Sequence, residues 1–258
     1  MSGTTELVSR ARAIGLCCRR SDNVFFSAMA LLILATVFLG FARSYYLAGT
    51  FRAPPLPSLI VHIHGAAFSG WILLFIIQIC LVSAGRVDIH RRLGIAGFTL
   101  ACLMVVLGVW TATASLARHS AEEVGRVYDS TKPIFDAKFA YIVPITDILI
   151  FATIIFFAFR NRSNPPAHKR LVLIATIALI EAAIGRWPFG FVHNGVSFLI
   201  QFAFLLPLVA YDLWSTGKIH RATLWASVFL LFLQVIKIPI GFTNGWRAFA
   251  TWASSVAR

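Results

Sequence analysis

Residues 24–41 read VFFSAMALLILATVFLGF and contain neither a charged side chain nor a proline. These 18 residues, at 1.5 Å each in a helix, extend about 27 Å, close to the roughly 30 Å of hydrocarbon in a bilayer. Four arginines precede the run, and the stretch Ser44-Tyr45-Tyr46 follows it in the manner of an interfacial aromatic belt. The run is longer than the apolar core of a signal peptide, and no small-residue cleavage pattern follows. We therefore predict a retained first transmembrane helix.

Six further apolar runs are long enough to span a membrane. They are 58–82, 94–117, 139–159, 171–187, 195–214 and 222–241. The composition agrees, because 59% of the residues are hydrophobic and 13% are charged, whereas soluble domains are about a quarter charged. The sequence thus predicts an all-α, polytopic membrane bundle of about seven helices. Its weakest span is the short fifth run, which contains Glu181 and Arg186.

The basic residues predict the orientation of the bundle. Thirteen Lys and Arg residues fall on the side of the N-terminal segment and nine on the opposite side. The positive-inside rule then puts the N-terminus in the cytoplasm and the C-terminus outside. Because these cations lie at helix ends, the net charge of +13 indicates contact with lipid headgroups and not with nucleic acid.

We divide the chain into a cytoplasmic segment (1–22), a transmembrane domain (23–241) and an interfacial tail (242–258). The tail carries Trp246, Phe249 and Trp252, which favour the membrane interface. A bacterial inner membrane is the expected location. The expected partners are the lipid bilayer and, for an accessory subunit, a larger membrane protein complex.

A basic motif headed by histidine recurs at the three predicted inner turns. It reads HRRL at 90–93, HKRL at 168–171 and, more loosely, HRATL at 220–224. Each copy opens a helix that runs outward. This pattern favours three related helical hairpins, 58–117, 139–187 and 195–241, after a lone first helix. The alternative is that any inner turn gathers such residues to contact lipid headgroups.

Ionisable residues inside the predicted spans are functional candidates, because a charge in hydrocarbon costs about 2.5–3.5 kcal/mol. Counting helical rise puts them in the outer half of the membrane. We expect them to line a polar chamber that opens outward. The predicted lining is His62, Asp147, Glu181, Arg186 and Lys237. The alternative is that the two acids pair internally with Lys237 or Arg186 and serve only structure.

The histidines suggest haem. A haem b held by two histidines needs axial imidazoles on facing helices at matching depth. His64 with His193 meets this condition near the outer surface. At the inner surface the pair is drawn from His90, His168 and His220, and we favour His90 with His168. Two haems, one at each face, would carry electrons across the membrane.

The stretch HRRLG at 90–94 resembles a turn of the cytochrome b561-like membrane families, which reads His-Lys/Arg-x-Leu-Gly. There the turn opens a helix and its histidine can ligate haem, so the resemblance implies that role for His90. It covers one turn only, since the copy at His168 lacks the glycine and the copy at His220 departs further. The longer string 62–94 also resembles uncharacterised bacterial multi-pass proteins, which implies a membrane location and no particular reaction.

These patterns favour a haem b protein that acts in electron transfer or as a respiratory accessory subunit. The alternative is a proton or small-solute pathway through the predicted chamber. Three glutamines inside the spans, Gln78, Gln201 and Gln234, would extend such a path. Pro207 and Pro239 would break helices around it.

A third interpretation is zinc hydrolysis in the membrane. Ser58 and His62 have the spacing of one motif in adiponectin-receptor-like and ceramidase-like proteins, which the sequence resembles in this respect. Those proteins also need an HxxxH motif in the last helix, and residues 222–241 contain no histidine. This interpretation is therefore the weakest of the three, and no metal other than haem iron is expected.

Overall fold

The computed structural model describes residues 2–125, 136–189 and 196–257, with the side chains of the first range from Arg20 to Ser120. The elements in these ranges are α1 (Ser2–Phe41), the short π-helix η1 (Ala42–Tyr46), α2 (Leu59–Ser83), α3 (Val87–Gly125), α4 (Ala137–Ala140), α5 (Ile142–Arg160), α6 (Pro165–Ala178), α7 (Glu181–Ile184), α8 (Ser197–Ala203), α9 (Leu206–Thr216), α10 (Arg221–Gly241) and α11 (Asn244–Val256). The described chain contains no strand.

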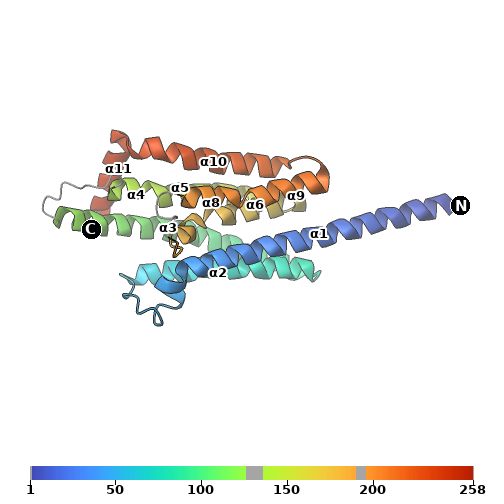
Figure 1. Ribbon diagram of the computed structural model, residues 1–258, viewed down its shortest axis with the longest axis horizontal. Helices are drawn as coiled ribbons and strands as arrows, with labels where there is room; N and C mark the ends of the chain where they lie inside the picture. The colour runs from blue at the N-terminus through green and yellow to red at the C-terminus, as the bar shows by residue number, and fades with distance from the viewer. Residues whose placement is uncertain (1, 126–135, 190–195, 258) are drawn as a thin grey trace.

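The helices lie side by side and reverse direction at two ends of one bundle (Figure 1). We call the end with the turns at 84–86, 161–164 and 217–220 the inner end, following the predicted orientation. The opposite end, with residues 47–58 and 242–243, is the outer end. Within the described ranges, six helices are long and apolar enough to cross a membrane, by length and composition. The prediction of an all-α membrane bundle is confirmed.

The fifth predicted span, 171–187, is not among these six because its helix breaks after Ala178. The next two backbone N–H groups donate to carbonyls three residues back, at 3.1 and 3.2 Å, and not four residues back. One further helical turn, α7, then begins at Glu181. A break at this depth leaves backbone carbonyls that hydrocarbon cannot satisfy, so other protein groups must bond to them.

The broken segment nevertheless runs along most of α1. Near the inner end the Nζ of Lys169 lies 2.6 Å from Oδ1 of Asp22. At the outer end α1 meets α7, where Gly40 lies directly against the backbone of Ala183. Asp22 and Gly40 are 18 residues apart, or about 27 Å along a helix. The segment therefore makes a seventh traverse of the bundle as a broken helix.

A second break separates α8 from α9, and its cause is a proline that the sequence analysis singled out. Pro207 stands in the first turn of α9, where its missing N–H costs nothing, and the chain is not helical at the two residues before α9. Pro239, in contrast, lies inside α10, which continues to Gly241. Of the two prolines predicted to break helices, Pro207 does so and Pro239 does not.

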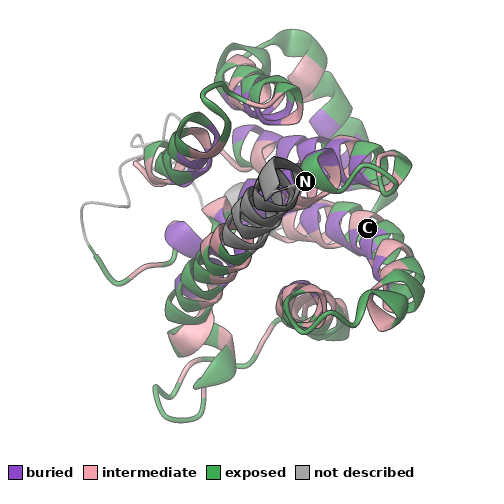
Figure 2. Cartoon of the chain, turned by 90° about the vertical axis from the view of Figure 1, so that its right-hand side faces the viewer, coloured by how far each residue is buried: buried purple, intermediate pink, exposed green. Residues whose placement is uncertain are grey.

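The most buried element is α6, which lies inside the bundle against α5 and α10. Leu173, Ile174 and Ile177 have no exposed surface. The end-on view shows buried residues toward the centre of the bundle and exposed ones around its periphery (Figure 2). Many of the peripheral side chains are large and apolar, such as Trp110 and Phe232, 61% and 57% exposed. In water such a surface would be unfavourable, so it indicates a lipid-facing exterior.

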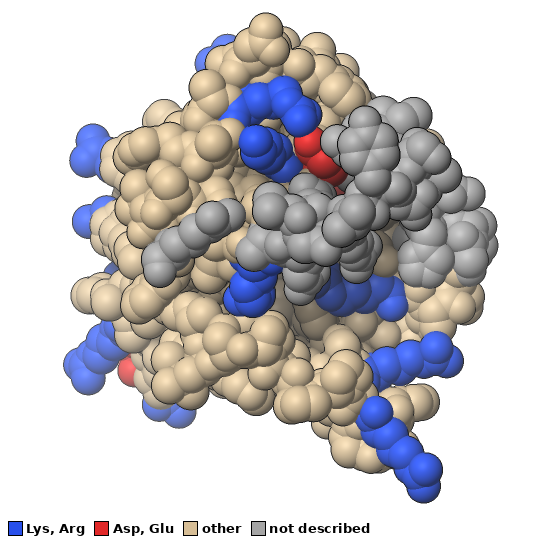
Figure 3. All heavy atoms as spheres, turned by 90° about the vertical axis from the view of Figure 1, so that its left-hand side faces the viewer, with Lys and Arg blue, Asp and Glu red and all other residues tan. Residues whose placement is uncertain are grey.

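The tail is a helix that crosses the outer end (Figure 1). Ala250 and Ala253 are buried beside Leu116 of α3, while Trp252 is 61% exposed. The amphipathic helix is what an interfacial tail requires. Figure 3 looks onto this end and shows Lys and Arg side chains around its rim and few acidic ones. The outer end of the bundle thus carries cations, at the depth of anionic headgroups.

Candidate functional site

Two of the predicted ligands lie together at the inner end. His90 and His168 are each the fourth residue of their helix, α3 and α6, and both helices begin at this end (Figure 1). Their ring centres are 6.3 Å apart and their ring planes are 80° apart. Both side chains are half-buried. Because each is the fourth residue of a helix that begins at the inner end, the two rings lie at matching depth, with the edge of one toward the face of the other.

Hydrogen bonding fixes the tautomer of the His168 ring. His168 Nδ1 lies 2.8 Å from the backbone oxygen of Ala158. A carbonyl only accepts, so this nitrogen donates, and in the neutral ring Nε2 is left as the lone-pair nitrogen. His90 Nδ1 is buried without a hydrogen-bond partner, although the ring as a whole interacts with the backbone of Gln78. On the adjacent α2, Gln78 Oε1 is likewise buried and unpartnered.

His220, the third inner candidate, has a structural role. Its Nδ1 accepts the backbone N–H of Ala222 at 3.1 Å and so caps α10. Burial first, and then the positive charge of Arg170, lower the pKa of His220, while Asp212 acts in the opposite direction. The lowered pKa keeps the ring neutral, as an accepting Nδ1 requires. His220 is thus engaged by its own helix and takes no part in the contact between His90 and His168.

The histidines predicted near the outer surface do not form a pair among the described residues. His64 packs against Phe68 with ring centres 4.2 Å apart, and its Nδ1 is buried without a partner. His193, its predicted partner, lies outside the described residues. His62 is exposed and lines a surface hollow with residues of the 44–56 segment, including Tyr45.

A second group of polar residues is buried in the outer half of the bundle, and we call Asp147, Glu181, Lys237, Gln201 and Gln234 the buried charge cluster. Lys237 Nζ lies 3.1 Å from Glu181 Oε2 and 4.0 Å from Asp147 Oδ1. Gln234 Nε2 donates to Asp147 Oδ1 at 2.8 Å and to Gln201 Oε1 at 3.1 Å. The structure therefore brings together three of the five residues predicted to line an outer chamber.

The helix break between α6 and α7 is joined to this cluster by Gln201. Its Nε2 donates to the backbone oxygens of Ile177 and Ala178, both at 3.0 Å. These are carbonyls at the break, where the helical ladder is interrupted. Gln201, which is fully buried, thus supplies the partner that a broken helix needs in hydrocarbon.

The other two predicted lining residues lie elsewhere. His62 is exposed near the outer loops. Arg186 is also exposed, donates from Nη1 to the oxygen of Ala182 at 2.6 Å, and has its guanidinium 5.0 Å from the ring centre of Phe41.

Lys237 is the partner of both acids, so the ion pairing that we considered as an alternative is present.

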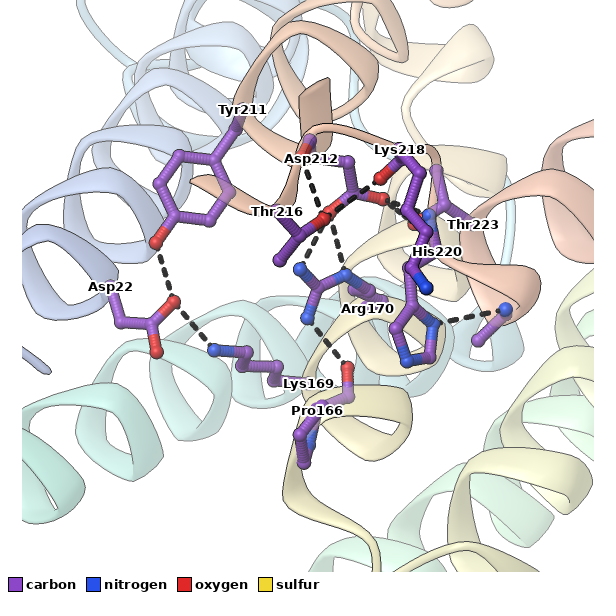
Figure 4. A network of polar contacts seen from close by, with 11 residues as sticks. Asp22, Pro166, Lys169, Arg170, Tyr211, Asp212, Thr216, Lys218, His220 and Thr223 are labelled. Carbon is purple, nitrogen blue, oxygen red and sulfur yellow. Dashed lines mark hydrogen bonds and ion pairs between the residues drawn. The ribbon is translucent and has the colours of Figure 1, made fainter. Parts of the chain in front are cut away.

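An inner ionic network links α6, α9 and α10 (Figure 4). Arg170 and Asp212 are 3% and 0% exposed, and Asp212 Oδ1 accepts from Arg170 Nε at 2.8 Å. Asp212 Oδ2 accepts from Thr223 Oγ1 at 2.6 Å and from the backbone of His220 at 3.0 Å. Both carboxylate oxygens of Asp212 accept two hydrogen bonds each, so the carboxylate has no position left for a ligand. This network stabilises the packing of α6, α9 and α10 at the inner end.

Asp212 was missed at the sequence level. It lies inside the predicted 195–214 span, so the rule that flagged Asp147 should have flagged it as well.

A metal centre of three or more His, Cys, Asp or Glu side chains does not occur among the described residues. No family model, no curated protein and no solved structure matches the chain.

Proposed function

We propose that the protein is a membrane redox protein that holds haem b between His90 and His168. The observation that carries the proposal is the 6.3 Å between their ring centres. Bonds from a metal to imidazole nitrogen are about 2.0–2.1 Å, so two imidazoles on opposite sides of one metal ion have ring centres about 6 Å apart. Direct aromatic contact also covers about 4.5–7 Å, so the ring nitrogens must be considered next.

The nitrogens favour a ligand. Metal-binding histidines commonly donate their other N–H to a backbone carbonyl, which orients the ring. His168 has this arrangement through Ala158. The buried Nδ1 of His90 has no partner, and an unsatisfied buried polar atom costs about 1–3 kcal/mol. A metal bound at Nδ1 would remove that cost.

The surroundings also fit a flat, largely apolar cofactor with an acidic edge. The ring centres of Phe98 and Phe159 are 4.1 Å apart and the rings are stacked. Phe98 belongs to α3, the helix of His90, and Phe159 follows Ala158, whose carbonyl accepts from His168. Arg91 and Arg92 follow His90 directly and are exposed. In the proposed site they would meet the haem propionates at the inner surface. When bound, the haem would supply reversible one-electron chemistry, while the chain holds it, orients it and keeps water from it.

A centre at the inner end would exchange electrons with a donor on the cytoplasmic side under the predicted orientation. The basic inner loops support the cytoplasmic orientation of that end, and a bacterial inner membrane is the proposed location. Such a centre would serve electron transfer by the chain alone or within a respiratory complex that holds the chain as an accessory subunit.

The first test is composition. The protein is expressed with ample haem precursor, purified in mild detergent, and its haem is extracted and measured against protein as the pyridine complex. We expect at least one haem b per chain. If His64 also binds haem, the value rises to about two per chain. A folded, iron-free preparation would contradict the proposal.

A further inference from the structure

The buried charge cluster does not balance its own charge. Asp147 and Glu181 supply two carboxyl groups, whereas Lys237 supplies one ammonium. Within the described residues, no other cation lies within ion-pair distance of either carboxyl. The side chains of Asp147, Glu181 and Lys237 are only 12%, 11% and 8% exposed. With both acids ionised, the cluster would hold one uncompensated negative charge inside the membrane, which is costly.

The amide groups around the cluster are neutral and cannot compensate this charge, and their hydrogen bonds fix which atom of each amide donates. Gln201 Nε2 bonds two backbone carbonyls, so it must be the donor and Oε1 the acceptor. Gln234 Nε2 bonds that Oε1 and also Asp147 Oδ1, so Gln234 cannot be turned over either. The remaining atom, Gln234 Oε1, is buried without any donor, in a side chain from a residue 2% exposed.

The cluster therefore lacks one positive charge and one hydrogen-bond donor. The groups that face it are Asp147 from α5, Glu181 from α7, Lys237 and Gln234 from α10, and Gln201 from α8. A protonated carboxyl supplies what is missing in one step, since it neutralises one carboxylate and provides an O–H donor. We propose that the cluster is a proton-binding site at the helix break, where Asp147 and Glu181 together hold one exchangeable proton.

The position of the cluster gives the proton a short route. Lys237 is four residues from Gly241, the last residue of α10, or about 6 Å of helical rise from the outer end. Glu181 opens the one-turn helix α7, which is followed by the exposed Arg186. The proton would come from water on the outer side: one carboxylate gains H⁺, and the charge of the cluster changes from −1 to 0. This site is independent of the proposed haem site.

The test is infrared spectroscopy of the full-length protein in lipid nanodiscs, titrated with pH in choline chloride. A protonated carboxylic acid has a carbonyl band that is separate from the amide bands and shifts in D₂O. We expect such a band in the wild type near pH 7, where exposed carboxyl groups are ionised, and we expect it to disappear at high pH. Its absence near pH 7 would overturn the proposal, whatever the variants show.

Charge counting predicts a distinctive pattern for the variants. Asp147→Asn and Glu181→Gln each leave one carboxyl with one ammonium, so both should lose the band. Lys237→Met leaves two carboxyls without an ammonium, so the band should grow about twofold. The control is Asp136→Asn, which alters an acid outside the cluster and should leave the band unchanged.

The remaining outcomes also decide the matter. A band that persists in both Asp147→Asn and Glu181→Gln would place the proton elsewhere and overturn the proposal. Loss of the wild-type band when sodium replaces choline at constant pH would show that the site takes a sodium ion in place of the proton, and would overturn the assignment to a proton. A band unaffected by sodium supports it. Haem content plays no part in these readings, so a protein without haem leaves the test intact.

Discussion

Gly40 of α1 lies directly against the backbone of Ala183 in α7, so closely that a Cβ at position 40 would overlap the Ala183 carbonyl. This contact holds the outer part of the broken segment against the first helix. Close backbone approach at a glycine is the usual way in which membrane helices pack, since lipid provides little hydrophobic force between them. The position of Glu181, two residues before Ala183, depends on it.

We therefore expect Gly40→Ala to destabilise the protein by about 1–3 kcal/mol, because backbone must move to admit the methyl group. The matched control is Gly70→Ala, in the interior of α2, where a Cβ would meet no atom within 4 Å. That change should be neutral or stabilise by up to about 1 kcal/mol through helix propensity. Thermal unfolding in detergent measures both. Equal midpoints for the two variants would show that the contact between α1 and α7 is loose.

The buried ion pair of Arg170 and Asp212 should be costly to break from one side. Asp212→Asn leaves a buried guanidinium without its counter-charge, and we expect a loss of about 3–5 kcal/mol. The control is Arg86→Ala, which removes an exposed 3.8 Å pair with Asp88 and should change stability by less than about 1 kcal/mol. Urea or thermal unfolding measures both effects. A loss of less than about 1 kcal/mol in Asp212→Asn would mean that the inner network contributes little to the stability of the bundle.

The bonds from Gln201 to the helix break predict a contrast between two glutamines. Gln201→Leu leaves the oxygens of Ile177 and Ala178 without this donor and should cost about 1–3 kcal/mol. Gln78→Leu removes a side chain whose Oε1 is already unpartnered, so its effect should be near zero. Thermal unfolding of the two variants side by side is the measurement, and a larger loss in Gln78→Leu would contradict this account of the break.

Acid should weaken the attachment of α11. Asp136 accepts the backbone N–H of Phe139 at 2.9 Å and pairs with Arg247 at 2.5 Å. Burial alone would raise the pKa of Asp136, but these two interactions outweigh it and the pKa is lowered. A depressed folded-state pKa means that the stabilisation is complete above the unfolded value of about 3.9 and is lost as pH falls through the folded value.

The check is the difference in unfolding midpoint between the wild type and Asp136→Asn. It should be constant from neutral pH down to about 5, where the wild type gains up to about 1 kcal/mol from the ion pair with Arg247, since Asn keeps the helix cap. The difference should then shrink toward zero as the pH falls further. A difference that grows in acid would have the wrong sign for a lowered pKa.

The sequence predicted the helices well because a span in hydrocarbon is a local property, set by about 20 consecutive residues. It also predicted that His90 and His168 lie at one depth, because both open a helix after an inner turn. It did not predict the break after Ala178. That break depends on Gln201, a residue of another helix, which bonds the carbonyls at the break. Contacts between distant segments are invisible to hydropathy.

The outer chamber was predicted in part for the same reason. Depth along the helices grouped Asp147, Glu181 and Lys237 correctly, since rise per residue is regular. Depth does not tell which way a side chain points, and Arg186 turns back to the carbonyl of Ala182. The fixed direction of the glutamine amides likewise required the positions of their partners.

The most direct test of the central claim is the visible spectrum of the purified protein before and after dithionite, recorded for the wild type and three histidine variants. We predict a Soret band and a sharp α-band in the wild type. Both should be lost or greatly reduced in His90→Ala and in His168→Ala, and retained in the control His220→Ala, whose histidine lies at the same end but caps α10. A colourless wild type, or bands that keep their full intensity after the loss of both His90 and His168, would contradict the claim that these two residues hold haem.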